Sequence, residues 1–345
     1  MKKFLGIIAA LFAVLLVVGC NPDDNGNTNG YEEGTTEGGT IGINNDLIEV
    51  DPDAEIGEIV VVTPAAEHGW LAGVIYFAEE AARELGFDNF RILTSANVAE
   101  QSAQLDDLIA QGVGAIVFQP HNAELELAAE RVVEAGIPLI VFNRYVNVDY
   151  DAYVAGSNFQ MGAESARKIG EGLNGEGFIV TVANPNAGST NIYRHEGFAS
   201  VMDEEFPNIE RFEMTVENFT QEAALSSMAD VLVANPHIDA VFSIDDESSL
   251  GILQAIREAG RTEIQFMSGG GGAQTYFREI EAEEGITLFS ATYSPRMMGD
   301  AIRVAFRILS GETISELDEN NQWIIPPSIV TRDNVADFFA EDSPY

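Results

Sequence analysis

One segment of the chain, residues 114–144, has the pattern that decides the fold: GAIVFQPHNAELELAAERVVEAGIPLIVFNR. It begins with a β-branched and aromatic run at 114–119, continues as a helical pattern at 123–135, and returns to an apolar run at 138–142. Gly136 separates the last two, as expected where a helix ends in the left-handed conformation. A strand, a helix and a second strand in this order form the unit of a parallel sheet.

The same alternation continues along the rest of the chain from Gly57 onward. Short apolar runs predict strands at 58–63, 90–94, 114–119, 138–142, 152–156, 177–183, 209–216, 238–244, 263–268 and 286–291. Amphipathic stretches predict helices between them, for example at 71–85, 99–111, 123–135, 158–172, 221–234, 247–259 and 294–310. The predicted fold class is therefore α/β, with doubly wound parallel sheets covered by helices.

The number of strand–helix units exceeds what one doubly wound sheet holds comfortably, so we predict two lobes. The first takes residues 56–156 plus about 294–322, and the second takes 157–293 plus about 323–345. A last apolar strand at 328–331 would bring the chain back between the lobes, and several such crossings make a hinge. A single barrel of eight units is the alternative fold.

The charge balance excludes one class of function. The chain has 17 Lys+Arg and 56 Asp+Glu, a net charge of −39, and lysine occurs only at Lys2, Lys3 and Lys168. Phosphate backbones and anionic lipid surfaces bind proteins through Lys and Arg, so we expect no nucleic-acid partner. Acidic residues spread along the whole chain indicate a surface adapted to salty surroundings, the alternative being an ordinary acidic soluble protein.

The first twenty residues, MKKFLGIIAALFAVLLVVGC, have the order of a secretory signal: two lysines, an apolar run and a small residue. The segment Leu16–Cys20 resembles the lipobox of bacterial lipoproteins, which implies a signal peptide at 1–19 and a lipid anchor on Cys20. A signal anchor with an incidental cysteine is the alternative. Residues 20–55 are poor in apolar side chains and are predicted to be a disordered linker.

The remaining composition argues against metal and cofactor sites. Cys20 is the only cysteine, so disulfides within the chain and cysteine-based zinc sites are excluded. The four histidines, His68, His121, His195 and His237, lie far apart with no metal-binding spacing. We expect neither a metal nor a cofactor.

Polar and aromatic residues follow nearly every predicted strand, at the edge where open parallel sheets bind ligands. Asn, Asp and Arg at these ends offer paired donors and acceptors that can grip neighbouring hydroxyl groups. Trp70, Phe219 and Tyr293 can supply flat apolar faces for a sugar ring. The run Gly269–Gly272 follows a strand, and we expect it to let the backbone approach the ligand, with Gly270 as the candidate residue. The pattern predicts a hydroxyl-rich, mostly uncharged ligand.

Residues 56–330 resemble the periplasmic sugar-binding proteins of the ribose, galactose and xylose type, the type I solute-binding proteins of ABC transporters. The resemblance rests on His68–Trp70, Gly136–Arg144, Ser157–Asn158, Arg194–Phe198 and Ala240–Glu247 with Gly251. It implies ligand contacts at His68, Trp70, Gln119, Asn143, Arg144, Asn158, Arg194, Phe219, Asp245 and Tyr293. Two departures leave the particular sugar open: the family commonly has Asp-Arg in place of Asn143-Arg144, and Asn-Asp in place of Asp245-Asp246.

These observations together predict an extracytoplasmic lipoprotein, not an enzyme, that binds a monosaccharide or polyol in an interlobe cleft. The resemblance implies delivery to an ABC permease with its ATPase, and we expect a monomer. A nucleoside-binding protein or a signal-molecule receptor of the same fold is the near alternative. A secreted carbohydrate-active enzyme is the distant one, although the carboxylates of Asp245, Asp246 and Glu247 are adjacent and diverge, unlike the facing pair that glycoside hydrolysis needs.

Overall fold

The computed structural model describes residues 56–66, 68–340 and 342–345. The predicted signal peptide, the predicted linker and Cys20 lie outside these residues. Within them, no helix is both long enough and apolar enough to span a bilayer, and no three His, Cys, Asp or Glu side chains are grouped so that they could hold a metal ion.

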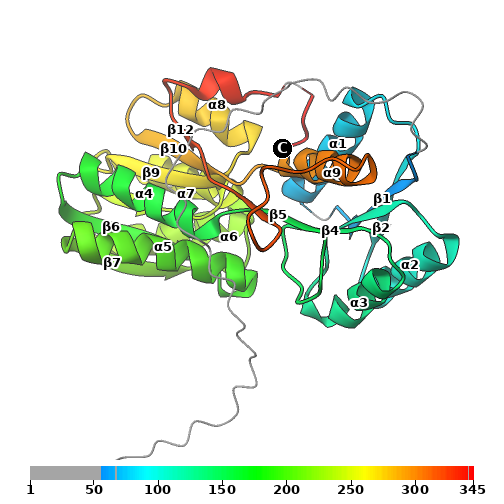
Figure 1. Ribbon diagram of the computed structural model, residues 1–345. Helices are drawn as coiled ribbons and strands as arrows, with labels where there is room; N and C mark the ends of the chain where they lie inside the picture. Colours follow the sequence, from blue (N-terminus) through cyan, green and yellow to red (C-terminus); the bar gives the residue numbers. More distant parts are fainter. Residues whose placement is uncertain (1–55, 67, 341) are drawn as a thin grey trace, which may run out of the picture. The chain divides into compact units, whose positions relative to one another are not determined.

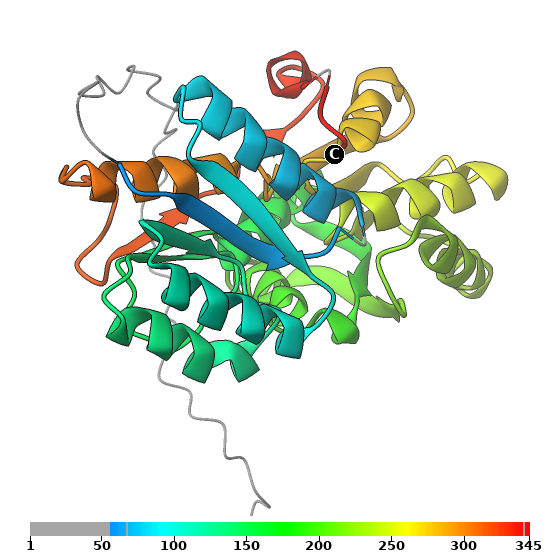
Figure 2. The same cartoon turned by 90° about the vertical axis from the view of Figure 1, so that its right-hand side faces the viewer.

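The first lobe is built on a six-stranded sheet of order β11-β5-β4-β3-β1-β2, in which every pair of neighbours is parallel. Its strands are β1 (Ile59–Pro64), β2 (Phe90–Ser95), β3 (Ala115–Phe118), β4 (Leu139–Phe142), β5 (Ala152–Gly156) and β11 (Gln322–Ile325). Its helices are α1 (Gly69–Glu84), α2 (Val98–Gln111), α3 (Glu126–Glu134), α9 (Met297–Leu309) and a 3-10 turn, η1 (Ala123–Leu125). Figures 1 and 2 show α1 and α9 on one face of this sheet and α2 and α3 on the other.

The second lobe is built on a sheet of order β12-β10-β9-β8-β6-β7, parallel except that β12 runs antiparallel to β10. Its strands are β6 (Glu176–Ala183), β7 (Asn208–Thr215), β8 (Ala240–Phe242), β9 (Phe266–Gly271), β10 (Thr287–Thr292) and β12 (Ile329–Val330). Its helices are α4 (Asn158–Gly172), α5 (Ser189–Glu205), α6 (Gln221–Ala234), α7 (Asp246–Glu258) and α8 (Gln274–Ala282), with 3-10 turns η2 (Pro185–Ala187) and η3 (Val335–Phe338).

Both sheets have the composition expected of strands covered on two faces. All residues of β1, β3 and β4 are buried, and these strands read as nearly continuous Val, Ile, Leu and Phe. The core on one face of the second sheet lies under α4 and α5, and a separate core on the other face lies under α6, α7 and α8. Gly136 has a φ of 72°, as predicted for the residue that ends α3. The two doubly wound sheets confirm the predicted fold class, and the alternative of a single barrel is wrong.

The chain passes between the two sheets after β5, after β10 and after β11. The strand β11 pairs with β5 of the first sheet as far as Ile325, so the last crossing lies after Ile325, a few residues beyond the boundary predicted at about 322/323. The reason is that β11 completes the edge of the first sheet, whereas the sequence alone shows only a short apolar stretch in a polar tail.

The glycine run was expected to follow the strand predicted at 263–268, but its first three residues belong to that strand. Gly269, Gly270 and Gly271 belong to β9 and pair with the last three residues of β10. Glycine is a poor strand former, but the ladder to β10 holds these residues extended. A Cβ at Gly269 would overlap the carboxylate of Asp246, so this position needs glycine because a side chain from α7 fills the space.

Candidate functional site

The predicted ligand residues lie beyond the carboxyl ends of strands in both lobes. Trp70 follows β1, Asn143 follows β4, Asp245 follows β8 and Tyr293 follows β10. Side chains of this group contact one another across the boundary between the two lobes, and Tyr293 is the residue that connects most of them.

Tyr293 follows the last residue of β10 and is buried. Its backbone N–H donates to the carbonyl of Gly271 at 2.9 Å, which anchors it in the second lobe. Its hydroxyl donates to Oδ1 of Asn143 at 2.7 Å, and its carbonyl accepts a hydrogen bond of 2.7 Å from Nε1 of Trp70. A Cβ at Gly156 would lie 2.7 Å from the ring, so this glycine makes room for Tyr293 at a crossing between the lobes.

Trp70 packs between rings from both lobes. Its ring is nearly parallel to that of Phe142, with centroids 6.3 Å apart, and lies 6.1 Å from that of Tyr293. Because the N–H of Trp70 is bonded to Tyr293, what the side chain can offer a ligand is an apolar face.

Arg194 projects from α5 and is buried in the second lobe. Its Nε donates to Oδ1 of Asn158 at 2.9 Å, and its Nη1 donates to the carbonyl of Ile244. The guanidinium carbon lies 5.2 Å from the centre of the Tyr293 ring. Burial lowers the pKa of Arg194 from its usual value, while Tyr293 and Asp245 act in the opposite direction. The two hydrogen bonds use two of the five N–H groups of a guanidinium, so others remain to bind ligand oxygens.

Asp245 caps α7 by accepting a hydrogen bond of 2.8 Å from the backbone N–H of Ser248. Burial, together with the neighbouring charges of Asp246 and Glu247, raises its pKa to about 7, although Arg194 lowers it in part. A carboxyl group with this pKa can donate as well as accept a hydrogen bond near neutral pH.

This raised pKa predicts a pH dependence of stability. Because the folded protein holds the proton of Asp245 more tightly than the unfolded chain, the group stabilises the fold fully below about pH 4. That contribution is lost as the pH rises through about 7. We expect Tm to fall more steeply between pH 5 and pH 8 in the wild type than in Asp245→Asn, which keeps the oxygen that accepts from Ser248. Parallel melting curves of the two proteins would contradict the assignment.

Asp246 is committed to the fold. It is fully buried and accepts hydrogen bonds of 2.7 Å from the backbone N–H groups of Gly272 and Ala273 and of 2.8 Å from the hydroxyl of Ser290. The carboxylate therefore ties the start of α7 to the ends of β9 and β10.

Gln119 lies just after β3 with its side chain fully buried. Its Oε1 accepts a hydrogen bond of 2.8 Å from the hydroxyl of Thr63, and its Nε2 has no partner among the described residues. A buried donor without a partner is costly, so the position suits a ligand oxygen or an ordered water.

The other predicted residues are placed less centrally. His68 is exposed just before α1, and Arg144 is exposed and donates from Nη1 to the carbonyl of His121. Phe219 is half-buried and packs against the core under α4 and α5, so part of its ring serves that core. At Gly270 a Cβ would lie 2.6 Å from the carbonyl of Ile244. Close packing of neighbouring strand ends explains this glycine without a ligand.

Comparison with known proteins identifies the family. Residues 59–313 match the model of the periplasmic binding protein domain. The chain belongs to the periplasmic binding protein family. Proteins of this family bind solutes outside the cytoplasm, so the chain is an extracytoplasmic binding protein rather than a member of an enzyme family.

Curated relatives of this periplasmic binding protein carry names of sugar- and polyol-binding proteins. The xylitol-binding protein of Mycolicibacterium smegmatis is 29% identical over 251 residues, which cover 71% of this chain and 69% of that protein. The D-apiose import binding protein of Actinobacillus succinogenes is 25% identical over 214 residues, which cover 61% of this chain and 69% of that protein.

Solved structures show the same type I fold. An ABC transporter periplasmic solute-binding protein of Actinobacillus succinogenes with bound D-allose superposes with a TM-score of 0.72 at 19% identity, covering 81% of this chain and 99% of that one. A solute-binding protein of Bacillus halodurans with bound myo-inositol gives a TM-score of 0.70 at 22% identity, covering 85% of this chain and 100% of that one. The two-lobed arrangement of this periplasmic binding protein is therefore that of its structural relatives.

Two contacts between the lobes were not predicted from the sequence. Gly69 at the start of α1 lies against the carboxylate of Glu247 on α7, since a Cβ at Gly69 would lie 3.0 Å from Oε1 of Glu247. Tyr345 packs against both lobes. The run Asp245–Glu247 was a sequence signal near the first contact, whereas no local sequence pattern indicates a role for Tyr345.

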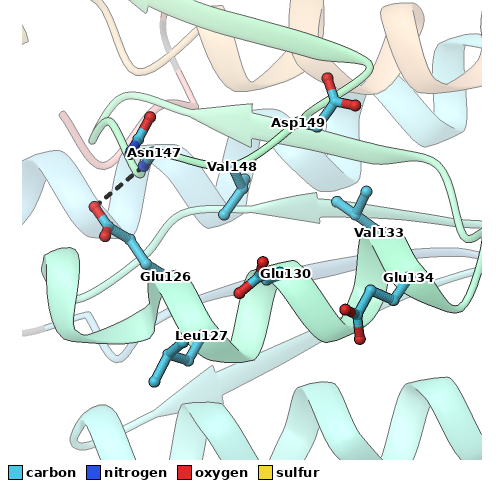
Figure 3. Close-up of a pocket in the computed structure, with 8 residues that line it drawn as sticks. All are labelled: Glu126, Leu127, Glu130, Val133, Glu134, Asn147, Val148 and Asp149. Atoms are coloured by element: carbon cyan, nitrogen blue, oxygen red, sulfur yellow. Dashed lines mark hydrogen bonds between the residues drawn. The ribbon is translucent and has the colours of Figure 1, made fainter. Parts of the chain in front are cut away.

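A separate pocket of about 570 Å³ lies on the first lobe between α3 and the segment after β4 (Figure 3). It is lined by Glu126, Leu127, Glu130, Val133, Glu134, Asn147, Val148 and Asp149. The backbone N–H of Asn147 donates to Glu126 across one end of it, at 3.1 Å. None of the predicted ligand residues lines this pocket.

Proposed function

We propose that this protein captures a monosaccharide or related polyol between its two lobes and delivers it to an ABC permease. The observation that carries the proposal is the network around Tyr293. It joins Trp70 and Asn143 of the first lobe to Arg194 and Asn158 of the second. The names of the relatives, which include xylitol and D-apiose binding proteins, support the same class of ligand.

The chemistry of the network suits hydroxyl groups. Arg194 offers charged donors and Asp245 offers a carboxyl group, while Gln119 has a buried donor without a partner. Trp70 adds an apolar face for the C–H groups of a sugar ring. A ligand that bonds to both lobes at once stabilises the closed arrangement, because contacts to the second lobe form only when the lobes meet.

The remaining parts of the proposal concern location and assembly. We place residues 1–19 as a signal peptide, Cys20 as the lipid anchor and residues 20–55 as a tether, supported by the lysines, the apolar run and the Gly-Cys pair. The acidic composition, with a net charge of −39, supports adaptation of the surface to salt. We further propose that the protein works as a monomer whose partner is the permease.

A thermal-shift screen in high salt tests the proposed ligand class. The purified protein is melted with pentoses, hexoses, polyols, uronic acids and nucleosides in turn. A ligand that binds only the folded state raises Tm by an amount set by its concentration relative to its Kd. We expect a sugar or polyol to give the largest rise. A rise with nucleosides alone, or with no compound of the panel, would contradict the proposal.

A further inference from the structure

Tyr345 lies against both lobes. In both views the end of the drawn chain lies beside α1 (Figures 1 and 2). A Cβ at Gly69 would lie 3.0 Å from Cδ2 of Tyr345, and a Cβ at Gly73 would lie 3.2 Å from its Cβ. On the other side, a Cβ at Gly271 of β9 would overlap the hydroxyl of Tyr345. The side chain therefore spans from the first turn of α1 to the end of a strand in the second lobe.

The backbone on both sides is shaped to hold this ring. A Cβ at Gly69 would contact the ring and a Cβ at Gly271 would overlap its hydroxyl, whereas a Cβ at Gly73 would contact the Cβ of Tyr345 and lie closest, at 2.7 Å, to Pro295. Tyr345 is 7% exposed and belongs to the core cluster under α6, α7 and α8. The ring is therefore packed into the protein between the two lobes.

The segment that carries the ring is also held locally. The backbone N–H of Tyr345 donates to the hydroxyl of Ser343 at 3.3 Å, and that hydroxyl donates to the carbonyl of Tyr345 at 2.6 Å. These bonds tie the backbone of Tyr345 to the side chain of Ser343.

The hydroxyl of Tyr345 lies near two groups of the proposed ligand site, Asp245 and Arg194, and near two further carboxylates. Asp245, Asp246 and Glu247 interact with it electrostatically, as does Arg194. Burial and these carboxylates raise its pKa well above the usual value, so the hydroxyl keeps its proton at neutral pH. Among the described residues it makes no hydrogen bond. A neutral O–H without a protein partner can donate to a ligand.

We propose that Tyr345 is a wall of the ligand site, closing the gap between α1 and the side-chain-free end of β9 and donating its hydroxyl hydrogen to a ligand oxygen. This inference rests on the proposed function. At Gly271 the strand end has no side chain of its own, and the phenol of Tyr345 supplies both an aromatic face and a donor there.

Binding measurements with two variants test the role of Tyr345. Wild type, Tyr345→Phe and Tyr345→Ala are titrated with xylitol, D-allose, D-ribose, myo-inositol and glycerol. Because Tyr345→Phe removes only a neutral hydrogen bond, we expect affinity to fall about 2- to 10-fold. Tyr345→Ala also removes the wall, so we expect a larger loss. Tyr150→Phe is the matched control, since it removes a hydroxyl that accepts a hydrogen bond of 2.9 Å from Gln322 within the first lobe.

Two results would overturn the proposal. Tyr345→Phe binding as tightly as the wild type would show that the hydroxyl does not reach the ligand. Tyr345→Ala binding more tightly than the wild type would show that the ring occupies the ligand's place.

Hydrogen exchange separates this inference from the proposed function. In the ligand-free protein, amides of residues 69–73 and 269–273 are expected to exchange faster in Tyr345→Ala than in the wild type, because the ring covers both segments. Equal exchange rates in Tyr345→Ala and the wild type would show that the ring does not cover these two segments. If the wild type binds none of the sugars, both the proposed function and the donor role of Tyr345 are contradicted. Hydrogen exchange then still tests whether the ring of Tyr345 lies between residues 69–73 and 269–273.

Discussion

Arg194→Met is expected to weaken sugar binding by more than about 100-fold, since each hydrogen bond from a charged group contributes about 1.5 to 3 kcal/mol. The guanidinium donates to Asn158 and to the carbonyl of Ile244, and it lies over the ring of Tyr293. Methionine fills a similar volume but restores neither the donors nor the charge. Titration calorimetry with the sugar that raises Tm most gives the ratio of affinities.

Arg194→Met also removes the donor to the buried carbonyl of Ile244 and to Oδ1 of Asn158, so the fold itself loses some stability. Arg261→Met is a matched control in the same lobe, because Arg261 donates to the carbonyls of Leu232 and Asn235 at 2.8 and 3.0 Å. We expect the control to lower Tm without changing sugar affinity. Equal affinities of the two variants would show that Arg194 does not contact the ligand.

Asp246→Ala is expected to lower the free energy of unfolding by about 3 to 5 kcal/mol, because it leaves buried donors unpaired. The lost acceptor serves Gly272 and Ala273, which follow β9, and Ser290, which lies in β10. For a protein of this size the expected fall in Tm is about 5 to 8 °C. Calorimetric melting of the ligand-free protein measures it.

The control for Asp246→Ala is Asp230→Ala, a change on the exposed surface of α6. We expect that variant to stay within about 0.5 kcal/mol of the wild type. A Tm for Asp246→Ala close to that of Asp230→Ala would contradict the structural role of the buried carboxylate.

The strands with continuous Val, Ile and Leu runs were predictable because burial on both faces leaves a strong local pattern. The edge strand β11 was missed, since its four residues are only half-buried and follow a polar stretch. The glycine end of β9 was placed after the strand predicted at 263–268, and only the pairing with β10 shows that these glycines are extended.

The candidate site could be predicted in part from the rule that ligands bind at the carboxyl ends of parallel strands. That rule found Tyr293 together with Trp70 and Asn143, each of which is hydrogen-bonded to Tyr293 in the structure. It could not find the place of Tyr345, because the contact joins residues more than 70 positions apart and depends on three separate glycines. The assignment of these residues to a ligand remains a prediction.

A crystal structure of the protein grown with the sugar that gives the largest rise in Tm is the most direct test of ligand capture between the lobes. We expect the sugar to lie between the two sheets, with oxygen atoms within about 3.2 Å of Arg194 in the second lobe and of Asn143 in the first. A sugar bound to one lobe alone, for example in the pocket beside α3, would contradict capture between the lobes.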